Sequence, residues 1–198
     1  MTTTRTAPDA SPEPGAARRA EWEAPVRLEV VLGSVRDGRF GPVVAEWFAA
    51  LAARRPDLRV DLLDVAADRT DFATRIESAD AVVVVTPEYN HSFPGPLKTA
   101  IDGVGAPWRA TPVGFVSYGG LSGGLRAVEP LRVVFAELHA VTVRKTVSFH
   151  QAWERFDSDG RPVDPDGPAA AASLLLDQLV WWARALRSGR ERQSYPAA

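Results

Sequence analysis

The feature that most constrains the fold of this chain is a short apolar run, Ala81 followed by valine at positions 82–85. Apolar residues that do not alternate with polar ones are typical of a strand that is buried on both faces. Such strands lie at the centre of parallel sheets, whose neighbouring strands are joined by long crossover connections, usually helices. The run therefore predicts an α/β fold in which helices cover both faces of a parallel sheet.

The segments on either side of this run alternate between strand and helix patterns. Four more strands are predicted, at residues 28–32, 58–64, 113–118 and 141–147. Helices are predicted at residues 42–53, 70–79, 96–103, 125–138 and 169–187. With right-handed crossovers, these elements form a five-stranded parallel sheet in a three-layer sandwich. Ligands of such sheets bind beyond the carboxyl ends of the strands, so the loops after the first, third and fourth strands are the informative ones.

The two ends of the chain differ in composition from its middle. Residues 1–24 are rich in Thr, Ala, Pro and charge, which predicts a disordered tail. Residues 25–188 form the predicted domain, and residues 189–198 are predicted to be a flexible tail. The N-terminus lacks the charged-then-apolar pattern of a signal peptide, so we expect a cytoplasmic location.

Composition excludes several classes of function. The sequence has no cysteine, which rules out disulfides, thiolate nucleophiles and cysteine-bound metals, and we expect no metal site. The formal net charge is −2, which favours neither a nucleic acid nor an anionic membrane as a partner. No apolar run approaches the length of a membrane span.

The loop after the first strand, residues 33–41, combines two glycines at its ends with polar side chains that suit a phosphate. Ser34 offers a hydroxyl donor, and Arg36 and Arg39 offer charged donors. The following helix adds free N–H groups and the positive end of its dipole. The alternative is a solvated loop in which Ser34 merely caps the helix. The loop contains neither the Gly-Lys-Ser/Thr of a P-loop nor a G-x-G-x-x-G dinucleotide motif.

The loop after the third strand, residues 86–98, contains three prolines that restrict its path. A rigid loop rich in polar groups and aromatic rings suits a flat heteroaromatic ligand. His91 is a candidate for proton transfer, although a lone histidine more often serves packing or hydrogen bonding. Glu88 has no basic partner nearby in the sequence, so we do not interpret it as a general base.

The loop after the fourth strand, residues 117–124, has four glycines within six residues. Glycine allows the backbone to approach a ligand closely, although a turn before a helix can need the same residues. Three such loops at one edge of a sheet favour a binding site. His139 and His150 lie far from these loops in the sequence, and we interpret them as structural.

Taken together, the three loops resemble the NADPH-dependent FMN reductase family of flavodoxin-like proteins. The matching motifs are residues 33–36, 87–98 and 117–120, with further matches at residues 100–102 and at Trp108. The resemblance covers about residues 27–148. It implies the flavodoxin-like strand order 2-1-3-4-5 and FMN as the cofactor, with NAD(P)H as the co-substrate.

The resemblance also implies which residues hold the cofactor. Ser34, Arg36 and Arg39 would line the phosphate pocket. The ring and ribityl chain would be bordered by Pro87, Glu88, Tyr89, Asn90 and His91, and on the other side by Ser117, Gly119 and Gly120. No side chain is assigned a catalytic role, because the flavin carries the chemistry.

The function predicted on this basis is an FMN-dependent NAD(P)H oxidoreductase that passes electrons to a small acceptor by a ping-pong mechanism. The acceptor could be a free flavin, a quinone, an azo or nitro compound, or a metal oxyanion. The alternatives are a flavodoxin-type electron carrier that serves a protein partner and a related module that no longer binds FMN. The last predicted helix carries apolar residues around most of its circumference, so we expect a homodimer or homotetramer.

Overall fold

The computed structural model describes residues 22–67 and 71–196, so most of the predicted N-terminal tail lies outside the described residues. The strands are β1 (Val26–Leu32), β2 (Leu58–Asp64), β3 (Ala81–Pro87), β4 (Pro112–Gly119) and β5 (Val141–His150). The helices are α2 (Gly41–Ala52), α3 (Phe72–Ser78), α4 (Gly95–Asp102), α5 (Leu125–Glu137) and α6 (Asp166–Arg192). Two short 3-10 turns, η1 (Ala106–Trp108) and η2 (Ala152–Glu154), complete the elements.

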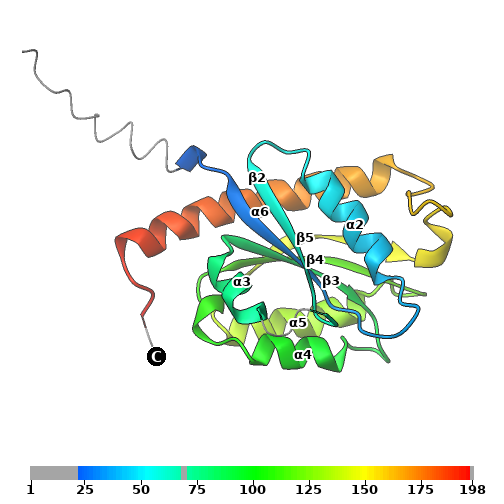
Figure 1. Ribbon diagram of the computed structural model, residues 1–198, viewed down its shortest axis with the longest axis horizontal. Coiled ribbons are helices and arrows are strands. Elements are labelled where there is room, and N and C mark those ends of the chain that lie inside the picture. The colour runs from blue at the N-terminus through cyan, green and yellow to red at the C-terminus, as the bar shows by residue number, and fades with distance from the viewer. Residues whose placement is uncertain (1–21, 68–70, 197–198) are drawn as a thin grey trace, which may run out of the picture.

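The strands form one five-stranded parallel sheet in the order β2-β1-β3-β4-β5. Helices α2 and α6 cover one face, and α3, α4 and α5 cover the other (Figure 1). The predicted three-layer flavodoxin-like sandwich is therefore confirmed. The strand that begins at Ala81 lies at the centre of the sheet, and all seven of its residues are buried.

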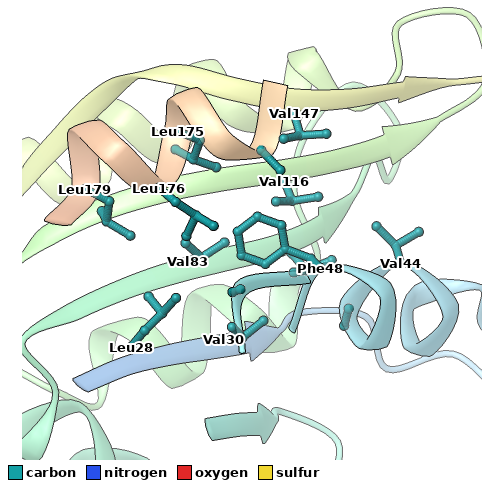
Figure 2. Packing of buried hydrophobic residues seen from close by; sticks show 14 of the residues in the cluster. Leu28, Val30, Val44, Phe48, Val83, Val116, Val147, Leu175, Leu176 and Leu179 are labelled. Carbon is teal, nitrogen blue, oxygen red and sulfur yellow. The ribbon is translucent and has the colours of Figure 1, made fainter. Parts of the chain in front are cut away.

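The core on the first face lies between the sheet and two helices that are far apart in the sequence. Figure 2 shows Phe48 of α2, strand residues such as Val83 and the leucines of α6 gathered in one cluster. Leu175, Leu176 and Leu179 are fully buried here. Burying a side chain of this size contributes roughly 1.5–3 kcal/mol, so α6 is an integral part of the domain.

The core on the second face is built from the same strands with the opposite set of side chains. Trp108, Phe115 and Phe135 form its centre, and the ring centroids of Trp108 and Phe135 are 5.1 Å apart. The indole N–H of Trp108 donates to the carbonyl of Ile101 over 3.0 Å, which fixes the turn after α4.

Strand β5 and helix α6 are both longer than the sequence pattern predicts. Strand β5 continues to His150, which pairs with Gly119 of β4, after a register irregularity between Val113 and Phe115. Helix α6 extends to Arg192 because Arg187 pairs with the buried Asp80 over 3.3 Å and Arg190 donates to a loop carbonyl. The predicted end at residue 187 was wrong because these partners lie far away in the sequence.

Three apolar residues of α6 stay exposed, namely Leu174, Trp181 and Trp182, while others of the same helix are buried against the sheet. The homodimer or homotetramer stays a prediction, because the structure holds one copy of the chain.

Within residues 22–67 and 71–196, no helix combines the length and the apolar character that crossing a membrane requires.

Candidate functional site

The loops that follow β1, β3 and β4 meet at the carboxyl edge of the sheet. The strand order reverses between β1 and β3, which is where open α/β sheets bind their ligands. The Gly33 N–H donates to the Val85 carbonyl over 2.9 Å, and the Glu88 N–H donates to the Tyr118 carbonyl over 3.3 Å. The structure therefore brings all eleven residues of the predicted cofactor site to one edge of the sheet.

The start of α2 forms a corner that has the features of an anion site. The first N–H groups of a helix have no intrahelical partner. No side chain caps this helix, so these groups stay available to a ligand. The hydroxyls of Ser34 and Tyr118 lie beside it, close to each other and buried, and apart from each other they have no hydrogen-bond partner among the described residues. A Cβ at Gly41 would stand 2.1 Å from Ser34 Oγ and 2.7 Å from the Tyr118 hydroxyl, so only glycine leaves room here.

Tyr118 was not among the predicted site residues. Its ring belongs to the core on the α2 face, and burial raises the pKa of its hydroxyl above the usual range. The hydroxyl is therefore a neutral donor at physiological pH. Its position in the Ser-Tyr-Gly-Gly motif, at the end of a strand that borders the site, was the available signal.

Arg39 is held by other parts of the protein. Its guanidinium pairs with Asp64 at the end of β2, with one contact of 2.8 Å, and also donates to the Ser34 carbonyl. Burial raises the pKa of Asp64, but the hydrogen bonds from Arg39 and the Ala66 N–H outweigh it and leave that pKa lowered. Arg39 therefore ties the loop after β1 to β2, which the sequence did not indicate.

Arg36 is the arginine of this loop that stays exposed. Its Cζ atom lies 3.7 Å from the ring centroid of Tyr89, which comes from the loop after β3. Such a cation–π contact contributes roughly 0.5–1 kcal/mol at an exposed site. It orients a charged donor at the mouth of the site and leaves its N–H groups accessible.

The loop after β3 contains a tight turn. Tyr89 and Ser92 exchange two backbone hydrogen bonds, over 2.8 and 3.1 Å. The two residues between them, Asn90 and His91, are exposed and both have positive φ, 51° and 66°. Positive φ is uncommon for non-glycine residues and clusters at binding sites. Pro87, buried at the end of β3, anchors the start of the turn.

Glu88 connects this turn to the glycine-rich loop. Its carboxylate, only 14% exposed, accepts hydrogen bonds from the Ser122 hydroxyl and from Arg126, whose Nη1 lies 3.3 Å away. The same Nη1 lies 3.5 Å from Nε2 of His91. Arg126, at the start of α5, is the basic partner that Glu88 lacks nearby in the sequence.

The glycine-rich loop is shaped by hydrogen bonds to one carbonyl. The hydroxyls of Ser117 and Ser148 both donate to the Gly123 carbonyl over 2.8 Å. Ser117 is fully buried, so its side chain shapes the loop from inside. Gly119 and Gly120 are half-buried at the surface of the loop.

His150 lies closer to the site than its sequence position suggests. Its Nδ1 is 2.9 Å from the Leu121 carbonyl of the glycine-rich loop. The contact follows from the extra length of β5. The continued alternation of buried Val147 and Phe149 was the sequence signal for that length.

Comparisons with known proteins agree with this geometry. The chain belongs to the NADPH-dependent FMN reductase family, whose characteristic sequence it matches over residues 26–154. It is 34% identical to a probable NADPH:quinone oxidoreductase 2 of Oryza sativa over 53% of this chain and 55% of that protein. The match thus spans just over half of the rice relative's length. It is also 29% identical to a 2-hydroxy-1,4-benzoquinone reductase of Burkholderia sp over 80% of this chain and 97% of that protein.

A solved structure shows the same fold. FerB of Paracoccus denitrificans, a flavoenzyme NAD(P)H:(acceptor) oxidoreductase, superimposes with a TM-score of 0.64 at 24% identity. The superposition covers 81% of this chain and 98% of FerB. At this level of identity the likeness concerns the fold alone.

Proposed function

We propose that this chain binds FMN at the carboxyl edge of its sheet, oxidises NAD(P)H and reduces a small acceptor. Free flavin, quinones, azo and nitro compounds and metal oxyanions stay open as acceptors. NAD(P)H and the acceptor would use one opening in turn, which is the basis of a ping-pong mechanism. The names of the relatives, which include quinone and FMN reductases, support the class of reaction.

The observation that carries the proposal is this corner at the start of α2. A buried hydroxyl that lacks partners costs roughly 1–3 kcal/mol, and the hydroxyls of Ser34 and Tyr118, which apart from each other have no partner among the described residues, lie beside the uncapped helix. A phosphate would accept from such donors and from the exposed Arg36. The FMN phosphate therefore fits the residues that are present.

The other end of the site suits a flat ring. The turn at Asn90 and His91 has positive φ at both residues, and Gly119 and Gly120 carry no side chains, so the backbone of both loops can approach a ring. Bound FMN would provide the redox chemistry, in which a hydride is taken from NAD(P)H and electrons are passed to the acceptor. The protein would bind the phosphate, orient the ring between two loops and limit the access of water.

A flavodoxin-type electron carrier is the second candidate. Two exposed cations, Arg36 on the loop after β1 and Arg126 at the start of α5, lie around the site. They favour an anionic small substrate such as NAD(P)H over a docking surface for a basic protein partner. The nearly neutral net charge of −2 agrees with this preference.

The test is the colour of the purified protein and its response to NADPH. We expect yellow protein that NADPH bleaches in the absence of oxygen. With a quinone as the acceptor, double-reciprocal plots at several acceptor concentrations should be parallel, because the two substrates use the opening in turn.

Each other outcome has a defined meaning. Yellow protein that NADPH does not bleach would favour the electron carrier. Protein that stays colourless after FMN is added would contradict the cofactor site. Intersecting lines would mean that both substrates bind at once, which would contradict the ping-pong mechanism.

Replacing Glu88 by alanine tests the connection between the two ring-binding loops. We expect Glu88→Ala to weaken FMN binding about 3- to 10-fold, on the order of 1 kcal/mol, because the turn loses Arg126 and Ser122 as partners. Titration of the apoprotein with FMN measures the effect. Glu129→Ala is the matched control, since Glu129 on α5 also pairs with an arginine, at 3.8 Å, but is 77% exposed. An equal loss in both variants would show that Glu88 has no special part in the site.

A further inference from the structure

The segment after β5 reaches the proposed ring site. Strand β5 ends at His150, beside Gly119. Gln151 then adopts a positive φ of 49°, and its N–H donates to the Gly120 carbonyl over 3.0 Å. The chain therefore turns back against the glycine-rich loop, and the short turn η2 follows at once.

This turn places Trp153 beside Gly120. A Cβ at Gly120 would stand 3.6 Å from Cη2 of Trp153, which is van der Waals contact, so the far end of the indole lies beside this glycine. The indole is nevertheless 60% exposed, and no other aromatic ring of the described residues pairs with it. One surface of this large apolar side chain therefore rests on the loop while much of the rest faces solvent.

The segment around Trp153 is firmly anchored. Ala152 is fully buried and Phe156 is 7% exposed. The centroid of the Phe156 ring lies 4.9 Å from the ring centroid of Phe149 and 5.6 Å from that of Phe40. Because its neighbours are held in this aromatic cluster, the exposure of Trp153 does not arise from a loose loop.

A second exposed apolar residue lies on the same loop pair. Leu121, which follows Gly120 directly, is 80% exposed, and its carbonyl is bonded to His150. Two large apolar side chains are thus exposed on segments that meet at Gly120, and exposed apolar side chains of this kind suit contact with a flat ring. Of the other exposed tryptophans among the described residues, Trp181 and Trp182 lie on α6 and contact each other, and Trp22 lies before β1.

We propose that Trp153, assisted by Leu121, forms the wall on which a flat aromatic electron acceptor, such as a quinone, stacks. The proposal rests on the function proposed above and narrows its substrate class. An indole face attracts an aromatic ring through dispersion and apolar burial, whereas it offers no donors to a strongly hydrated inorganic anion. The acceptor site is therefore built for aromatic molecules, and metal oxyanions would be poor substrates.

The test compares Trp153→Ala and Trp153→Phe in the FMN-loaded protein with two acceptors. One is 1,4-naphthoquinone, which can stack, and the other is ferricyanide, which cannot. We expect Trp153→Ala to lower kcat/KM for naphthoquinone about 3- to 10-fold, as is usual for the loss of an aromatic pair. Trp153→Phe should stay within about twofold of the wild type, and ferricyanide reduction should change less than about twofold in both variants.

A binding measurement separates stacking from effects on the chemistry. Without NAD(P)H the oxidised protein does not turn over, so equilibrium dialysis yields the Kd of naphthoquinone directly. That Kd should rise about 3- to 10-fold in Trp153→Ala and stay unchanged in Trp153→Phe. Val163→Ala is the control for a general disturbance, because Val163 is 67% exposed in the segment that joins β5 to α6.

An unchanged Kd in Trp153→Ala would overturn the inference. Equal losses with both acceptors, or a loss of bound FMN, would also overturn it, because they would indicate a structural role. A failure of the proposed function would be visible in the wild type itself, as protein that NADPH does not bleach, and is thus distinguishable from a failure at Trp153.

Discussion

Replacing Arg36 by alanine should weaken FMN binding about 10- to 150-fold and leave riboflavin binding nearly unchanged. Arg36 is exposed and oriented by the Tyr89 ring beside the start of α2. Hydrogen bonds to charged groups contribute roughly 1.5–3 kcal/mol, which corresponds to this range at about 1.4 kcal/mol per tenfold. Riboflavin has the same ring and ribityl chain as FMN but no phosphate. Titration of both flavins into the wild-type and Arg36→Ala apoproteins measures the two losses.

The riboflavin titration separates the loss of phosphate recognition from general damage, since misfolding would weaken both ligands alike. Arg59→Ala is the matched control, because Arg59 is an exposed arginine on β2, within a strand rather than in a loop of the site. It should change neither affinity by more than about twofold. Equal losses for FMN and riboflavin in Arg36→Ala, or no loss for FMN, would overturn the assignment of this loop to the phosphate.

Replacing Gly124 by alanine should destabilise the protein by about 2–5 kcal/mol. Gly124 precedes α5 with a φ of 83°, a conformation that costs other residues roughly 1–2 kcal/mol. Its added Cβ would also stand 2.7 Å from the Tyr118 nitrogen and 2.9 Å from the Tyr118 carbonyl oxygen. These are backbone atoms of β4 that have little freedom to shift, and such overpacking costs about 1–3 kcal/mol. Urea unfolding, followed by circular dichroism, measures the change.

Gly38→Ala is the matched control for this substitution. Gly38 has a similar φ of 64°, but its added Cβ would meet no atom within 4 Å. Only the backbone cost applies, and it is partly offset by the lower entropy of the unfolded chain, so we expect about 1 kcal/mol. Similar losses in the two variants would show that the backbone conformation alone accounts for the effect and that the contact with β4 is unimportant.

Much of the fold could be predicted from the sequence because the signals for it are local. The valine run of β3 shows no polar alternation, which requires burial on both faces, and the glycine- and proline-rich loops between elements mark where strands end. The family motifs then indicated the strand order and the eleven residues of the proposed cofactor site, which the fold brings to one edge of the sheet.

The partners of those residues could not be predicted, because they are distant in the sequence. Nothing in the sequence around Arg39 indicates that it pairs with Asp64, 25 residues away. Likewise, nothing near Glu88 indicates that it pairs with Arg126, 38 residues away. Ion pairs of this kind depend on which loops the crossovers place side by side. They hold Arg39 against Asp64, whereas Arg36 stays exposed.

The sequence by itself thus determined the elements, their layers and the loops that carry the proposed site, since hydrophobic periodicity and turn residues act over short stretches of chain. Only the tertiary structure decided which distant side chains lie around the proposed site. It placed the Tyr118 hydroxyl beside Ser34 at Gly41, and through the extra length of β5 it placed Trp153 against Gly120. Both contacts join segments that share no local pattern, and they form because parallel strands end together at one edge of the sheet.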